Sequence, residues 1–76
     1  MLEFMRMFRS PGNFRSGSYD YEECGTKPDG SRIFVVTGIE NRSGERGKVC
    51  EVCCKADDKM CKNRLIRLLK SFERNN

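Results

Sequence analysis

Five cysteines set the chemistry open to this 76-residue chain, which contains no histidine. Four of them lie in the segment "CEVCCKADDKMC", residues 50–61, and the fifth, Cys24, lies well upstream. Clustered cysteines bind a metal ion, close disulfides or act as nucleophiles, depending on compartment and neighbours. Because histidine is absent, the usual thiolate–imidazole pair of nucleophilic catalysis is absent too, and any soft-metal site must be rich in thiolates.

A structural zinc ion is the arrangement that the cysteine spacing favours. Cys50 and Cys53 form a C-x-x-C at the end of a predicted strand, where two thiolates can turn toward one tetrahedral ion. Cys61 falls in the first turn of a predicted helix, whose positive end stabilises a thiolate. A hairpin would return Cys24 to the neighbourhood of Cys50. We therefore expect one structural Zn²⁺ bound by Cys24, Cys50, Cys53 and Cys61, with Cys54 outside the set.

The same spacing leaves other roles for the cysteines open. Adjacent Cys53 and Cys54 do not indicate which of the two would bind a metal. Disulfides in an exported chain are the second interpretation, because adjacent cysteines recur in small stapled domains. Plain buried thiols are the third. A redox role is the last, since a thioredoxin-like C-x-x-C needs a βαβ unit for which the chain is too short.

The elements that must position these cysteines are a hairpin and a helix. "KPDGS", residues 27–31, is typical of a turn, and residues 32–37, rich in β-branched and aromatic side chains, predict a central strand. Residues 48–53 predict its partner, and residues 19–24 could add a third strand. The apolar spacing in residues 58–73 predicts an amphipathic helix. We therefore expect a small α+β fold: a β-hairpin or three-stranded antiparallel meander with one C-terminal helix, stapled by zinc.

The N-terminal residues differ in character from the rest. Residues 1–18 are expected to be an arm, either flexible or packed on the body, and residues 19–76 a single small cysteine-rich domain. The apolar side chains of the arm could enter a groove of a target protein or close a homodimer; they are Phe4, Met5, Met7 and Phe8. Charged residues interrupt them, so no secretory apolar core and no membrane span of ~20 apolar residues is expected. The expected location is intracellular, cytoplasmic or nuclear.

Basic charge is concentrated where the cysteines lie. Residues 46–76 carry nine basic and four acidic side chains, whereas residues 17–45 carry three basic and six acidic ones. This asymmetry favours an anionic partner, most simply nucleic acid, over a merely solvated basic face. The contact residues expected at the hairpin end and on the helix are Arg42, Arg46, Lys48, Lys62, Arg64, Arg67, Lys70 and Arg74.

These observations predict a binding protein and not an enzyme. The acidic cluster of Asp20, Glu22 and Glu23 is expected to be a solvated face, because general acid–base catalysis needs paired carboxylates in a pocket. The favoured function is a zinc finger-like module that contacts nucleic acid. The alternatives are a small regulatory adaptor or inhibitor that binds a protein through the N-terminal arm, and a secreted, disulfide-stapled ligand.

Overall fold

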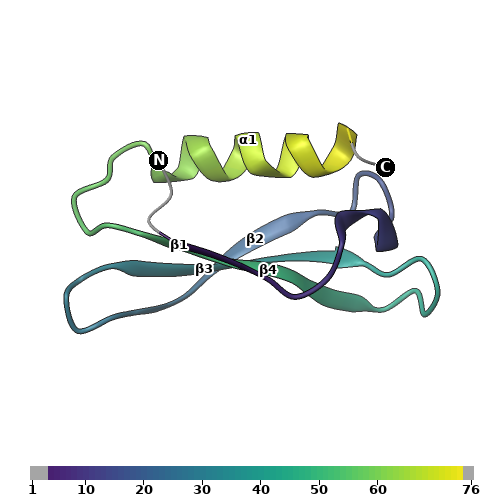
Figure 1. Cartoon of the computed structure of the whole chain (residues 1–76), viewed down its shortest axis with the longest axis horizontal. Helices are drawn as coiled ribbons and strands as arrows, with labels where there is room; N and C mark the ends of the chain where they lie inside the picture. The colour runs from purple at the N-terminus through teal and green to yellow at the C-terminus, as the bar shows by residue number, and fades with distance from the viewer. Residues whose placement is uncertain (1–3, 75–76) are drawn as a thin grey trace.

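The computed structural model describes residues 4–74, apart from the side chain of Phe4, and shows two layers (Figure 1). A four-stranded antiparallel sheet forms one layer, and the helix of the described chain lies across one face of it. The elements are β1 (Phe4–Met7), the 3-10 turn η1 (Pro11–Asn13), β2 (Asp20–Thr26), β3 (Arg32–Ile39), β4 (Arg46–Cys54) and α1 (Cys61–Arg74). The small α+β class is confirmed, and β1 is a strand that the sequence did not predict.

The strand order β1-β4-β3-β2 places the two most apolar strands in the middle of the sheet. β3 pairs antiparallel with β2 on one side and β4 on the other, so the predicted meander is confirmed. The predicted turn before β3 is also confirmed. The Lys27 amide donates to the Ser31 carbonyl at 2.8 Å, and Gly30 has a φ of +89°. That left-handed conformation favours glycine, because it has no Cβ to clash.

The core lies between α1 and the face of the sheet that α1 covers. Alternate residues of a strand point the same way, so Cys50 and Val52 of β4 lie fully buried on this face. Phe34 joins them from β3. From α1, Leu65 and Phe72 pack down on the sheet as part of the apolar stripe that the sequence predicted. Burial of this stripe determines which side of α1 faces solvent.

The connection between β1 and β2 closes one end of the core. These two strands are opposite edges of the sheet, so the chain between them must cross over the strands in between. Phe14, halfway along, is only 1% exposed and its backbone bridges to Glu40 at the end of β3. The Tyr19 ring lies 6.2 Å from the Phe14 ring and 5.6 Å from the Phe72 ring, measured between centroids. Residues 4–18 are therefore part of the folded body.

A disulfide joins the helix to the sheet where the sequence predicted a zinc staple. Cys54, the last residue of β4, is bonded to Cys61, the first residue of α1, and their Cα atoms lie 6.0 Å apart. The helix begins three residues later than predicted, at Cys61 instead of residue 58. Asp58 lies before the helix, where its carboxylate accepts a hydrogen bond from the backbone N–H of Met60 at 3.0 Å.

The contact between Phe14 and Gly38 gives a test of this packing. A Cβ added at Gly38 would lie 3.0 Å from the Phe14 ring, closer than van der Waals contact. We expect Gly38→Ala to lower the free energy of unfolding by about 1–3 kcal/mol through overpacking, measured by urea denaturation. Gly12→Ala is the control, because a Cβ there meets nothing within 4 Å. Equal stability of both variants would contradict the packing of Phe14 on the sheet.

Candidate functional site

The two cysteines of the C-x-x-C lie on opposite faces of the sheet. β4 does not turn at this motif but continues as a strand to Cys54. A spacing of three residues in a strand reverses the direction of the side chain. Cys50 accordingly pairs with Val36 and belongs to the core beneath α1, whereas Cys53 pairs with Ile33 and is buried outside that core. One tetrahedral ion could not bind both thiolates in this geometry.

The remaining predicted ligands are also kept apart. Cys61 is bonded to Cys54, so its sulfur carries no thiolate to offer a metal. Cys24 lies exposed on the edge strand β2, at an irregularity in the pairing between Glu23 and Gly25. The pair Cys54–Cys61 was not predicted, although alternation through β4 would place Cys54 on the helix side together with Cys50.

Chemical reactivity of the buried thiol at Cys50 is suppressed by its surroundings. Burial raises the pKa of Cys50 from 9.0 to about 11, because the thiolate would lose its hydration in the apolar core. The group therefore stays a neutral thiol at neutral pH, which is neither a good nucleophile nor a metal ligand. Its position under α1 is that of a small apolar core residue.

The described residues therefore do not fit the predicted zinc ion. Residues 4–74 contain no cluster of three or more histidine, cysteine, aspartate or glutamate side chains placed to hold a metal. Cys24, Cys50, Cys53 and Cys61 are not brought together, for the reasons of strand alternation and disulfide pairing given above. Zinc binding stays a prediction from the sequence that this geometry does not support.

The basic helix presents most of its predicted contact residues to solvent. Of the five named on α1, Lys62, Arg67, Lys70 and Arg74 are exposed; we call these four the basic face. Arg64 differs, because it is half-buried and its guanidinium forms an ion pair with Asp58 before the helix. It helps to fix the start of α1 and is not part of the basic face.

The acidic residue of α1, Glu73, is engaged by the chain before β2. Glu73 accepts hydrogen bonds from the Ser16 hydroxyl at 2.5 Å and from the Gly17 amide at 2.7 Å. Its carboxylate therefore ties α1 to the chain between η1 and β2. Between Cys61 and Phe72, α1 carries no acidic residue.

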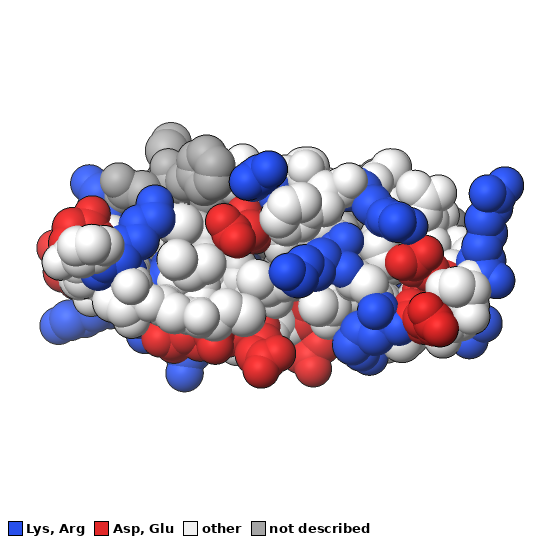
Figure 2. Space-filling view, turned by 90° about the horizontal axis from the view of Figure 1, so that it is seen from below, with Lys and Arg blue, Asp and Glu red and all other residues white. Residues whose placement is uncertain are grey.

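The sequence predicted one contact surface shared by the hairpin end and the helix. In the structure, the two lie on different faces of the sheet. Lys48 pairs with Thr37 in the register, and both point to the face of the sheet away from α1. The Arg46 guanidinium lies on that same face, where it donates to the Thr37 hydroxyl at 2.9 Å and to the Ser18 carbonyl at 3.2 Å. Figure 2 shows this open face, with basic and acidic side chains interspersed. Arg46 and Lys48 therefore lie on the opposite side of the molecule from the basic face.

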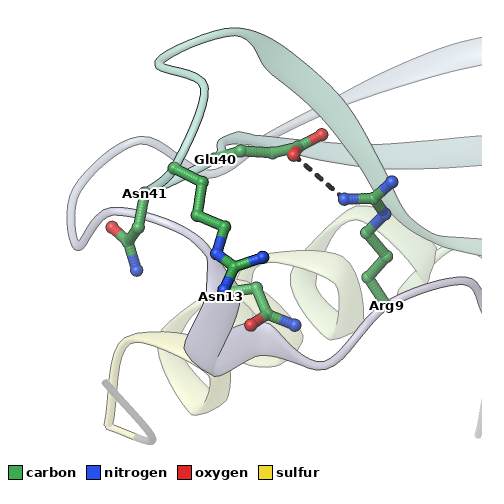
Figure 3. Close-up of a pocket in the computed structure, with 5 residues that line it drawn as sticks. Arg9, Asn13, Glu40 and Asn41 are labelled. Carbon is green, nitrogen blue, oxygen red and sulfur yellow. Dashed lines mark hydrogen bonds and ion pairs between the residues drawn. The ribbon is translucent and has the colours of Figure 1, made fainter.

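Arg42, the last of the predicted contact residues, lines a polar pocket at the tip of the β3–β4 hairpin. The pocket has a volume of about 470 Å³ and is lined by Arg9, Asn13, Glu40, Asn41 and Arg42. Figure 3 shows Arg9 and Glu40 reaching toward each other, with their ion pair at 2.9 Å. Sequence reasoning missed Arg9 and Asn13 as site residues, since nothing local connects them with a hairpin some thirty residues later in the chain.

Compared with protein families, curated proteins and solved structures, this chain matches none of them. Among the described helices, none is long and apolar enough to cross a membrane.

Removing the disulfide tests the role assigned to Cys54 and Cys61. Because the bonded residues are separated by seven positions, closing this short loop stabilises the fold by about 2.5 kcal/mol in the chain-entropy account. We expect the double variant Cys54→Ala/Cys61→Ala to lose about that much free energy of unfolding in urea without reductant. Cys24→Ala, at an exposed position, should change stability by less than ~0.5 kcal/mol. If the double variant were as stable as the wild type, the disulfide would have no structural role.

Proposed function

We propose that this chain is a non-enzymatic binding domain whose basic face contacts nucleic acid. The observation that carries the proposal is the placement of four cations, Lys62, Arg67, Lys70 and Arg74, on the exposed side of one helix. The acidic residue of this helix, Glu73, accepts hydrogen bonds from Ser16 and Gly17. The phosphates of nucleic acid are neutralised by such side chains, and release of their counterions drives association.

The spacing of the basic face suits several phosphates at once. At 1.5 Å per residue, the four side chains extend along roughly 18 Å of helix. Arg67 and Lys70 are three residues apart, and Lys70 and Arg74 are four apart, so like charges are neighbours on one surface. Each such pair costs a few tenths of a kcal/mol in the free protein. An anionic polymer along α1 would remove this repulsion.

The core and the disulfide support the proposal by holding α1 in one orientation. Leu65 and Phe72 lie buried against the sheet, and Cys61 is bonded to Cys54. The helix can then present its cations without first losing rotational freedom, and preorganisation of this kind favours binding. A non-enzymatic role is consistent with the Cys50 thiol, whose raised pKa keeps it protonated at neutral pH.

A protein partner is the second candidate, because β1 is an edge strand with exposed apolar side chains. Met5 is 45% exposed, Met7 43%, and Phe8, just after the strand, 41%. The free edge of such a strand can pair with an extended segment of another chain. These exposed side chains support β1 as the surface of the predicted adaptor or homodimer. The predicted contribution of the Phe4 side chain lies outside what the structure describes.

The disulfide also bears on the third interpretation. Disulfides persist mainly in oxidising compartments, so Cys54–Cys61 favours an exported, stapled ligand over the predicted intracellular location. Both locations stay predictions, and a nucleic-acid contact on α1 is chemically compatible with either.

Charge reversal on α1 tests the proposed function. Binding of a short DNA duplex should weaken steeply with salt, with a slope of log K against log salt of up to about −3.6 if all four cations contact phosphates. The variant Arg67→Glu/Lys70→Glu should bind at least roughly tenfold more weakly at low salt and halve that slope. Fluorescence anisotropy measures both quantities, and circular dichroism checks that the variant is folded.

The matched control reverses two exposed cations away from α1. Arg15→Glu/Lys48→Glu lowers the net charge of +4 by the same four units as the helix variant. We expect it to retain most of the affinity and slope, because neither residue lies on the basic face. Equal losses in both variants would mean that only net charge matters, and no DNA binding by the wild type would favour the protein partner at β1.

A further inference from the structure

We propose that the polar pocket at the β3–β4 hairpin tip binds a phosphate group. The pocket is built from two segments far apart in the sequence, Arg9 and Asn13 on one side and Glu40, Asn41 and Arg42 on the other. In the view of Figure 3, Glu40 enters from the hairpin above and Asn13 from the turn below. The site is distinct from the basic face of α1 and does not depend on the function proposed for it.

The two guanidinium groups of the pocket have N–H donors that form no hydrogen bond within the described residues. Within residues 4–74, Arg42 makes no ion pair or hydrogen bond through its side chain. Arg9 uses its Nη1 atom to donate to Glu40, and none of its other donors is engaged by the described residues. A guanidinium carries five N–H donors in a planar fork, which matches two oxygens of a phosphate group. A pocket lined by two guanidinium groups is therefore suited to an oxyanion.

The two asparagine side chains have different roles. The side-chain Nδ2 atom of Asn41 donates to the Gly12 carbonyl at 3.2 Å, and this bond fixes the hairpin against η1. The Asn13 side chain makes no hydrogen bond in the described part of the chain, although it lines the pocket. Its amide group can donate to a ligand oxygen between the two arginines. The pocket thus offers both charged and neutral donors.

Backbone hydrogen bonds hold the pocket open before any ligand arrives. The backbone N–H of Asn41 donates to the backbone carbonyl of Asn13 at 2.9 Å, and this bond joins the two segments directly. The hairpin tip is closed by two further bonds at 2.9 Å, from the Glu40 amide to the Glu45 carbonyl and from the Gly44 amide to the Glu40 carbonyl. A frame fixed in this way reduces the ordering cost of binding a small anion.

Glu40 sets the charge of the pocket and orients Arg9. Its carboxylate accepts a hydrogen bond from Arg9 at 2.9 Å and repels an incoming anion. The pocket still carries a net positive charge, because Arg9 and Arg42 together outweigh the one carboxylate. A Cβ at Gly47 would lie only 2.5 Å from the Glu40 Oε1 atom, which shows how closely this carboxylate sits on β4. The net positive charge and the surplus of N–H donors select a phosphate group over a cation or a neutral ligand.

Titration with inorganic phosphate at constant ionic strength, followed by NMR of side-chain N–H groups, tests the proposal. We expect saturable shifts of the Asn13 amide and of the Arg9 and Arg42 Nε–H groups. Arg42→Gln should weaken phosphate binding by roughly tenfold or more, because it removes a charge-assisted pair of hydrogen bonds. Glu40→Gln should tighten it, since the opposing charge is lost while an oxygen remains for Arg9.

Arg15→Gln is the matched control, because the Arg15 guanidinium lies near Gly44 of the hairpin tip but does not line the pocket. It should leave phosphate affinity unchanged. Two short oligonucleotides, one with and one without a 5′-phosphate, distinguish a strand end from a small phosphate compound as the source of the group. Equal weakening by Arg15→Gln and Arg42→Gln, or no saturable shift in the wild type, would overturn the proposal.

Discussion

The bond between Cys54 and Cys61 is the constraint from which the exposed surfaces of this protein follow. It joins the end of β4 to the first residue of α1, so the helix must begin directly over the sheet. From that point, burial of Leu65 and Phe72 leaves a single rotation about the helix axis. The basic face is the side of α1 opposite this buried stripe, and its direction is therefore a consequence of the core. The same anchoring separates α1 from Arg46 and Lys48 on the far face of the sheet.

A chain of this size needs such a constraint. Its hydrophobic residues are few and a third of the chain is charged, 34% by count, which limits the apolar area that folding can bury. The protein compensates in two ways. The disulfide limits the freedom of the unfolded chain, and Phe14 closes the end of the core from the β1–β2 connection. Two of the remaining cysteines, Cys50 and Cys53, fill space as small buried side chains.

Local patterns predicted the parts of the fold whose causes are local. The stripe of α1, the apolar run of β3 and the Pro-Asp-Gly turn each follow from neighbouring residues, and all were found. β1 was missed because four residues, Phe4–Met7, show no decisive period, and their pairing with β4 spans most of the chain. The cysteine pairing depended on a single residue. A strand that ends at Cys53 permits a metal-binding turn, whereas a strand that reaches Cys54 puts Cys53 on the opposite face from Cys50 and Cys54.

The candidate site was predicted in the same uneven way. Exposure of Lys62, Arg67, Lys70 and Arg74 follows directly from the helical period, which places them off the apolar stripe. The ion pair of Arg64 could not be predicted from that period, because its partner, Asp58, lies before the helix, where the turn brings the two charges together. The pocket at the hairpin tip could not be predicted, since it forms only when Arg9 and Asn13 cross the end of the sheet to meet residues 40–42.

Mapping the cysteines by mass spectrometry tests this account most directly. Protein purified without reductant would be alkylated in the native state, digested, and fragmented between Cys53 and Cys54 to assign any linked peptide. The account predicts one disulfide between Cys54 and Cys61, ready alkylation of Cys24, and labelling of Cys50 and Cys53 only after denaturation. Free thiols at Cys54 and Cys61 in the folded protein, together with a zinc ion in its native mass, would contradict it.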